Sequence, residues 1–256
     1  MIREYVGSIP FTVMPLHAAI DLVLTTAIGN GSQGSDRGTA IHFCNAYNVA
    51  LARSDSHYRQ TLEAGDVVFS DGVPITWVGK RLRPDIAHEW ERVYGPDVMS
   101  GVFERSTGQG PRHYLLGGKP EVLTALEQGL RRRYPDALIV GADSPPFRPP
   151  SDSDLAERDA RILGSGADIV WVGLGTPKHD YEVARLARSL PVAAVSVGAA
   201  FDFLAGTKRQ APVWMQRSGT EWLFRFASEP RRLAKRYLWG NSVFAWEAAT
   251  SFRRKR

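Results

Sequence analysis

The chain has 256 residues, 43% of them hydrophobic, which suits one large α/β domain with an appendage rather than two full domains. A single cysteine, Cys44, excludes an internal disulfide and a cysteine-based zinc site, and it fits a reducing compartment. The net charge of +5 is uneven, because residues 208–256 contain twelve Lys or Arg and three Glu, a net charge of +9 that predicts a terminal element facing phosphates, a lipid surface or nucleic acid.

The predicted elements begin with a helix over 16–28, followed by a glycine-rich connection over 29–38 without a fold of its own. The N-terminal sequence MIREYVGSIP lacks the apolar stretch of a signal peptide. Beyond residue 38, short apolar runs alternate with helical patterns. We expect strands at 40–44, 66–70, 113–116, 137–140, 168–172 and 192–197. We expect helices at 49–53, 96–105, 120–134, 154–163 and 177–189.

This alternation predicts an α/β fold with a mostly parallel sheet and helices on both faces. The C-terminal tail, residues 207–256, is predicted to be helical and amphipathic, because Trp222 and Phe226 are four residues apart, as are Arg232 and Arg236. No segment approaches the ~20 apolar residues of a membrane-spanning helix, so any membrane contact is expected to be peripheral. A docked helix whose cations are merely solvated explains the tail alone equally well.

Small or polar residues follow each predicted strand. In open parallel sheets ligands bind outside the carboxyl ends of the strands, so these loops are expected to share one ligand-binding edge. They contain Asn45, Asp71, Gly72, Gly117, Gly118, Gly141, Gly173, Gly175 and Gly198.

The segment DIVWVGLGTPKHD, residues 168–180, combines a buried strand, a glycine turn and a helix start at Pro177, with Lys178 in the first turn. Free backbone N–H groups and a partial positive charge at such a helix start favour a diphosphate. The loop lacks the third glycine of a dinucleotide fingerprint and the GKS or GKT of a Walker loop. A tight turn without a ligand remains the alternative, here and for LLGGKPE at 115–121.

Acidic side chains suggest two further sites. Asp71 directly follows a strand, so it is a candidate general base, although turn formation is the commoner reason for Asp-Gly. Asp152 and Asp154 mimic an Asp-x-Asp metal site, but they open a helix, so capping is the favoured explanation and no metal site is predicted. No histidine pair at i, i+4, no GxSxG and no HExxH occurs, which weakens hydrolase and metalloprotease interpretations.

The order and spacing of several blocks make residues 9–237 resemble the TagA/WecG/CpsF glycosyltransferase family. The blocks are FCNAYNVALA, SDGVP, ERVYGPDVM, YLLGGKPE, VGLGTPKHD, GAAFDFLAG, RQAPVWMQ and EWLFRFASEPRRLAKRY. The resemblance implies a Rossmann-like bacterial enzyme that transfers a sugar, typically N-acetylmannosamine or a related uronic acid, from a UDP donor to an undecaprenyl-diphosphate-linked sugar. It also implies an inverting reaction in cell-surface polysaccharide synthesis, without a metal or another cofactor.

Carried over to this sequence, the resemblance implies that Asp71 is the general base and that Arg92 handles the donor phosphates. His179 and Asp180 stand where the family has Gln and Glu, and Phe43 stands where members similar to TagA have threonine. The residues expected to bind substrate are Asn45, Gly72, Gly95, Asp97, Gly117, Gly118, Gly173, Gly175, Pro177, Lys178, His179, Asp202, Arg225, Arg231 and Arg232.

The resulting hypothesis has a Rossmann-like glycosyltransferase domain over 1–206 and a basic, membrane-facing helical appendage over 207–256. Its partners are a UDP-sugar, a lipid-linked acceptor and the inner face of the cytoplasmic membrane, with no nucleic acid, and a homo-oligomer stays open. A nicotinamide oxidoreductase is one alternative, but it needs a full fingerprint. A nonenzymatic module that binds anionic polymers is the other, given the sequence pI of about 9.5.

Overall fold

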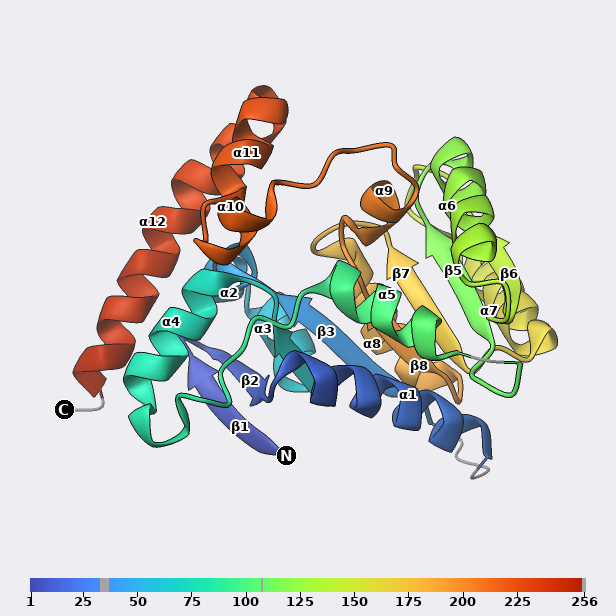
Figure 1. The fold of residues 1–256 in the computed structure, drawn as a ribbon, viewed down its shortest axis with the longest axis horizontal. Coiled ribbons are helices and arrows are strands. Elements are labelled where there is room, and N and C mark those ends of the chain that lie inside the picture. Colours follow the sequence, from blue (N-terminus) through green and yellow to red (C-terminus); the bar gives the residue numbers. More distant parts are fainter. Residues whose placement is uncertain (33–36, 107, 255–256) are drawn as a thin grey trace. The chain divides into compact units, whose positions relative to one another are not determined.

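A computed structural model (Figure 1) describes residues 1–32, 37–106 and 108–254, except the side chains of 31, 32, 232, 235 and 254. The strands are β1 (Ile2–Val6), β2 (Ile9–Val13), β3 (Thr39–Cys44), β4 (Val67–Ser70), β5 (His113–Gly117), β6 (Ile139–Asp143), β7 (Ile169–Gly173) and β8 (Ala193–Ser196). The helices before β8 are α1 (Leu16–Ser32), α2 (Ala46–Ser54), α3 (Ser56–Glu63), α4 (Val73–Leu82), α5 (Gly95–Arg105), α6 (Pro120–Arg133), α7 (Asp152–Ser165) and α8 (Lys178–Ser189). After β8 follow α9 (Ala200–Leu204), α10 (Val213–Arg217), α11 (Glu221–Ser228) and α12 (Pro230–Arg254).

Six strands form one sheet in the order β4-β3-β8-β7-β5-β6. The pairs β3–β8, β8–β7, β7–β5 and β5–β6 are parallel. Parallel neighbours need crossover connections, and the helices between the strands provide them. The predicted α/β fold with a mostly parallel, Rossmann-like sheet is therefore confirmed.

The chain separates into two compact units, each made of discontinuous segments. Unit 1 consists of Met1–Leu16, Phe43–Tyr94 and Gln210–Arg256. Unit 2 consists of His17–His42 and Gly95–Arg209. The expected boundary between residues 206 and 207 stays a prediction.

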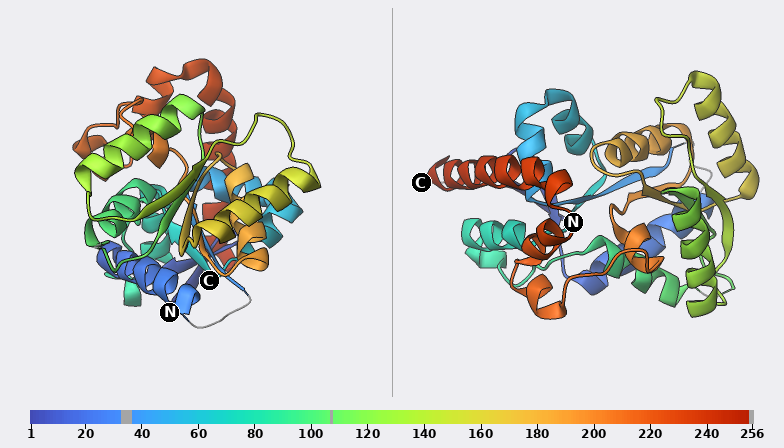
Figure 2. Two further views of the ribbon diagram at one scale, coloured as in Figure 1. Left: turned by 90° about the vertical axis from the view of Figure 1, so that its right-hand side faces the viewer. Right: turned by 90° about the horizontal axis from the view of Figure 1, so that it is seen from above.

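Unit 2 buries both faces of its central strands β5, β7 and β8. Figure 2 shows α7 and α8 on one face of these strands and α1, α5 and α6 on the other. Side chains alternate between the faces: Tyr114 and Val170 pack in the cluster that includes Ile162 of α7 and Leu186 of α8. On the next residue of β7, Trp171 stacks near Phe103 of α5 instead. Burial on both faces explains why these strands are continuous apolar runs in the sequence.

Unit 1 begins with an antiparallel pair, β1–β2, which was not predicted from the sequence. The two strands are joined by Gly7 and Ser8, and Gly7 has φ 64°, a left-handed conformation that favours glycine. A side chain at Gly7 would also collide with Val49 of α2 and Glu247 of α12. The C-terminal helix α12 packs along α2 and contributes buried Leu233 and Phe244 to this unit (Figure 1).

Most predicted elements are confirmed with ends shifted by a few residues, including the helical tail. The connection expected over 29–38 is wrong at its start, because α1 continues through Ser32, and residues 33–36 lie outside the described residues. The Asn30 side chain hydrogen-bonds Thr39 Oγ1 (3.1 Å), which helps to order this last turn. In the described part of the chain, no helix is both long enough and apolar enough to cross a membrane.

Candidate functional site

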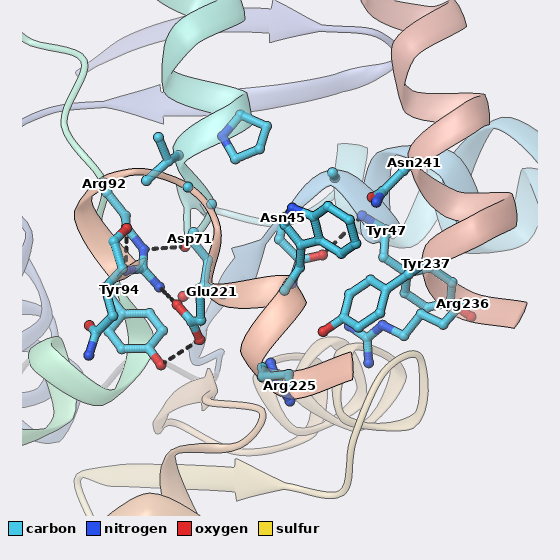
Figure 3. A pocket seen from close by; sticks show the side chains of 17 residues that line it. Asn45, Tyr47, Asp71, Arg92, Tyr94, Glu221, Arg225, Arg236, Tyr237 and Asn241 are labelled. Carbon is cyan, nitrogen blue, oxygen red and sulfur yellow. Dashed lines mark hydrogen bonds and ion pairs between the residues drawn. The ribbon is translucent and has the colours of Figure 1, made fainter. Parts of the chain in front are cut away.

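A pocket in unit 1 brings together the two predicted catalytic residues and part of the tail (Figure 3). Asn45 lies directly after β3, Asp71 and Gly72 lie directly after β4, and Arg92 lies in the segment that precedes α5. Helices α11 and α12 close the pocket with side chains from the tail. These side chains belong to Glu221, Trp222, Arg225, Arg236, Tyr237 and Asn241.

The loops after β3 and β4 are held against each other. The Asp71 N–H donates to the carbonyl oxygen of Cys44 (2.9 Å). Asn45 caps α2, because its side chain accepts from the Tyr47 N–H (3.0 Å). A Cβ at Gly72 would lie 3.2 Å from the Asn45 Cβ, so glycine allows the two loops to approach closely. Asn45 and Asp71 are therefore fixed as neighbours in this pocket.

Hydrogen bonds to the end of β4 fix the backbone on both sides of Arg92. The Val93 N–H donates to the Ser70 carbonyl (2.9 Å), and Ser70 Oγ donates to the Glu91 carbonyl (2.8 Å). Arg92 itself donates from Nε to the carbonyl oxygen of Asp71 (2.9 Å). The guanidinium is thus tied to the residue proposed as the general base.

The environment of Arg92 is rich in negative charge. Its Nη2 is 2.5 Å from Glu221 Oε2, and the Tyr94 hydroxyl donates to Glu221 Oε1 (3.1 Å). Burial disfavours the charged guanidinium, but the carboxylates of Asp71 and Glu221 raise the pKa of Arg92 above its usual value. Burial, together with Glu221 and then Asp71, also raises the pKa of Tyr94, so the phenol stays protonated and can donate.

The other side of the pocket is cationic and aromatic. Arg225 of α11 and Arg236 of α12 line it, and the Arg236 guanidinium lies 4.3 Å from the centre of the Tyr47 ring. The rings of Trp222 and Tyr237 are 5.8 Å apart. Charged nitrogens beside aromatic faces are suited to a ligand that has both phosphate and sugar groups.

The other two tail residues predicted to bind substrate, Arg231 and Arg232, are not among the described residues that line this pocket. Arg231 is exposed at the start of α12. The side chain of Arg232 lies outside the described residues. Their assignment to substrate binding therefore stays a prediction.

Unit 2 contains a second pocket, a cavity of about 480 Å³ at the ends of β5 and β7. Gly118, Gly173 and Lys178 line it, together with the proline-rich segment 145–150. Its volume is in the range of small-molecule sites. In the part of the chain that is described, no carboxylate pairs with Lys178, which stands at the start of α8. A cation at a helix start, where the helix dipole is positive, can bind a phosphate.

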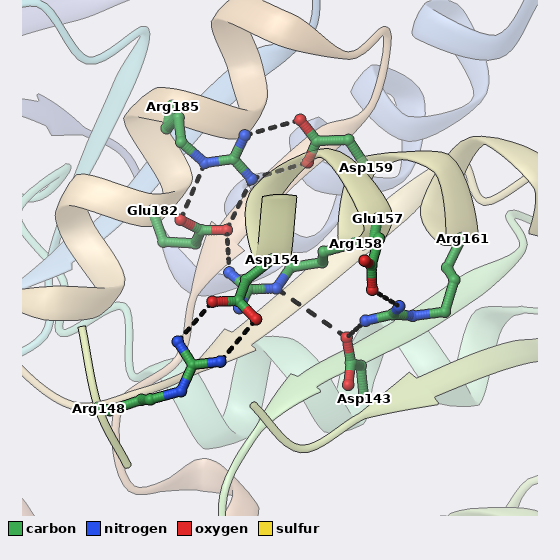
Figure 4. A network of polar contacts seen from close by, with 9 residues as sticks. All are labelled: Asp143, Arg148, Asp154, Glu157, Arg158, Asp159, Arg161, Glu182 and Arg185. Atoms are coloured by element: carbon green, nitrogen blue, oxygen red, sulfur yellow. Dashed lines mark hydrogen bonds and ion pairs between the residues drawn. The ribbon is translucent and has the colours of Figure 1, made fainter. Parts of the chain in front are cut away.

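Glycines and ion pairs shape this unit 2 pocket. A Cβ at Gly117 would lie 2.7 Å from the Gly173 backbone, and Gly117 has φ 122°, so only glycine fits there. Figure 4 shows the ion pairs around the wall. The buried Arg158 pairs with Glu182 (2.9 Å). Asp154 pairs with Arg148 and forms a capping box with Ser151, so the predicted capping role of Asp154 is confirmed.

His179 and Asp180, the departures from the family pattern, belong to a buried cluster. Asp180 is fully buried, with Oδ1 3.0 Å from His42 Nδ1 and Oδ2 3.3 Å from His179 Nε2. Burial would raise the pKa of Asp180, but the contacts with His179 and His42 keep it well below its usual value. His179 is only 3% exposed, and its Nε2 also contacts Thr176 Oγ1 (3.2 Å).

The other predicted unit 2 residues lie at loop and helix starts. Gly95 and Asp97 begin α5. Gly175, with φ 80°, and Pro177 precede α8. Asp202 lies on α9, where its carboxylate pairs with Lys208 (3.1 Å). Among the described residues, no group of three or more His, Cys, Asp or Glu side chains could hold a metal ion.

A model of the glycosyl transferase WecG/TagA/CpsF family matches residues 5–256. The chain belongs to this family. Membership of the WecG/TagA/CpsF family makes the protein a glycosyltransferase of cell-surface polysaccharide synthesis, with a sugar-nucleotide donor and a lipid-linked acceptor. It also overturns the two alternatives, an oxidoreductase and a nonenzymatic module. The match includes the tail, so α10 to α12 are part of the family pattern.

Several residues in the unit 1 pocket of this WecG/TagA/CpsF protein were not predicted from the sequence. Tyr94, Glu221 and Arg236 were not predicted as site residues, although they contact Arg92 or line the pocket. In the sequence, Glu221 entered only the net charge of the tail, as one of its three acidic residues. An acidic residue within a cationic segment was the available signal.

Proposed function

We propose that this protein is an inverting, metal-independent glycosyltransferase that uses a UDP-sugar, with N-acetylmannosamine or a related sugar as the transferred group. The acceptor is a sugar linked to undecaprenyl diphosphate. The observation that supports this proposal is the shared pocket of Asp71 and Arg92, joined by the hydrogen bond from Arg92 Nε to the Asp71 carbonyl. A base and a cation held together are what such a displacement requires.

In the proposed reaction, an acceptor hydroxyl attacks the anomeric carbon from the side opposite the diphosphate. A carbon–oxygen bond to the acceptor forms while the bond to the diphosphate oxygen breaks, and the diphosphate leaves with the electron pair. The hydroxyl proton passes to the carboxylate of Asp71. Arg92 stabilises the charge that develops on the departing diphosphate, a contribution that typically amounts to a few kcal/mol.

We assign donor binding in unit 2 to the pocket at the start of α8. The ammonium of Lys178 and the positive end of the α8 helix dipole favour phosphate oxygens, and Gly118 and Gly173 leave the backbone accessible. The apolar wall of segment 145–150 suits the base of a nucleotide. A cation such as Lys178 can neutralise phosphate charge without a metal ion.

We further propose that the tail contacts the inner face of the cytoplasmic membrane, where a lipid-linked acceptor is found. Large apolar side chains of the tail are exposed: Trp214 by 67%, Leu238 by 72% and Trp246 by 50%. The net charge of +9 over 208–256 adds attraction to anionic lipids of about 1 kcal/mol per cation near the surface. Exposed aromatic and cationic side chains on helices are typical of interfacial binding.

Mass spectrometry tests the proposal directly. The protein is incubated with a polyprenyl-diphosphate-linked acceptor and a panel of UDP-sugars, and the product is analysed for the added sugar. We expect one UDP-sugar to give a product whose mass rises by one sugar residue, and NMR of that product should show an inverted anomeric configuration. Transfer from a polyprenyl-phosphate sugar alone, or retention of configuration, would refute the proposed donor or mechanism.

A further inference from the structure

Glu221 is the one acidic residue of the tail that lines the unit 1 pocket among the residues described. It accepts two hydrogen bonds, one from Arg92 Nη2 (2.5 Å) and one from the Tyr94 hydroxyl (3.1 Å) (Figure 3). The side chains are largely buried, with Arg92 17% and Glu221 14% exposed. Low exposure strengthens such a pair and raises the cost of removing one partner.

The contacts of Arg92 constrain its guanidinium from several directions. The Tyr94 ring covers one face, with the guanidinium carbon 3.7 Å from the ring centre. Nε is bound to the Asp71 carbonyl (2.9 Å) and Nη2 to Glu221, whereas Nη1 has only a long contact of 3.5 Å to the Gln216 carbonyl. Both Glu221 and Tyr94 therefore act on the orientation of the guanidinium plane.

We propose that Glu221 is a positioning residue, which orients Arg92 for the departing diphosphate and so makes catalysis depend on the tail. This inference rests on the proposed roles of Asp71 and Arg92. Glu221 holds Nη2 and leaves Nη1 as the donor with the weakest existing contact. An arginine fixed in advance loses less side-chain entropy when it binds a phosphate oxygen. The tail thus completes the site through an anion as well as through its cations.

A second ion pair in unit 1 provides a matched control. Glu247 of α12 pairs with Arg53 of α2, with Arg53 Nε 3.4 Å from Glu247 Oε1. Glu247 is 8% exposed on its side chain, and neither residue lines the pocket. Glu247→Gln and Glu221→Gln therefore remove the same charge from a buried tail glutamate, but only Glu221→Gln affects the contacts of Arg92.

The test is a double-mutant cycle that uses wild type, Glu221→Gln, Arg92→Ala and the double variant. Turnover is measured with a UDP-sugar and a lipid-linked acceptor at high enzyme concentration, and the affinities for UDP and inorganic pyrophosphate are measured by calorimetry. We expect Glu221→Gln to lower turnover by on the order of tenfold or more and to weaken pyrophosphate binding. In the Arg92→Ala background, the same change should alter turnover and affinity by less than about twofold, because Glu221 acts through Arg92.

Three outcomes would overturn the inference. Additive losses in the cycle would show that Glu221 acts independently of Arg92. Tighter pyrophosphate binding by Glu221→Gln would show that Glu221 competes with the phosphate for Arg92 instead of orienting Arg92 toward it. A loss of turnover that Glu247→Gln matches at an equal fall in melting temperature would mark a purely structural role. If Asp71→Asn and Arg92→Ala both keep wild-type turnover, the proposed function itself fails.

Discussion

Replacing Asp71 with asparagine removes the proposed proton acceptor and leaves the rest of the pocket in place. The hydrogen bonds that place Asp71 between Cys44 and Arg92 are made by its backbone N–H and carbonyl, which asparagine retains. The variant should therefore fold and bind UDP almost as the wild type does. An amide cannot accept the acceptor's proton, so turnover should fall by on the order of 10²-fold or more. That factor corresponds to about 2.7 kcal/mol of transition-state stabilisation.

The assay compares single-turnover sugar transfer and calorimetric UDP binding for Asp71→Asn and a control. Asp85→Asn is a suitable control, because Asp85 is an exposed carboxylate of unit 1 whose side chain pairs with Arg83 and does not line the pocket. The control should keep wild-type turnover. Near-wild-type turnover of a folded Asp71→Asn protein would remove Asp71 from the role of general base.

Three further predictions concern metal ions, pH and the tail. Activity should persist in EDTA, because Asp154 is held by Arg148 and Ser151 as a helix cap; loss of activity that Mg²⁺ or Mn²⁺ restores would contradict the metal-independent mechanism. Burial lowers the pKa of His113 to about 3 from 6.5, so its contribution to stability is complete above pH 6.5 and is lost as the pH falls toward 3. Denaturant unfolding should show this loss for the wild type and a shallower pH dependence for His113→Asn, whereas equal slopes would refute it. Arg225→Ala, in the pocket, should lower turnover more than vesicle affinity, whereas the exposed Arg253→Ala should affect only vesicle affinity; equal effects of Arg225→Ala on both would make it a general membrane contact.

The sequence predicted the sheet well because each of its strands is a short apolar run bounded by small or polar residues. Other elements were missed for physical reasons. Helix α4 starts with Val73 and Pro74 directly after Asp-Gly, which suggested a turn, although proline fits the first turn of a helix. The pair β1–β2 depends on Gly7 and on packing against α12, which local patterns do not reveal.

The candidate site likewise has residues that were predicted from the sequence and contacts that were not. Asp71 was proposed as a site residue because it directly follows a strand, and Arg92 because of the family resemblance, and the structure places both in one pocket. Their link to Glu221 could not be predicted, since it joins residues 129 positions apart in the sequence and depends on tertiary packing. His179 shows a related limit: its position in a motif indicated ligand contact, whereas its burial beside Asp180 is visible only in three dimensions.

The discontinuity of unit 1 has a consequence during synthesis. Asp71 and Arg92 leave the ribosome well before Glu221, which contacts Arg92, and before Leu233 and Phe244, which are buried in the same unit. Domains generally fold as units from the N-terminus, but this unit must wait for its last segment while unit 2 is already fully synthesised. A nascent or prematurely terminated chain therefore contains Asp71, the proposed general base, without the finished pocket. If the proposed roles hold, we expect catalysis only after translation has passed the tail.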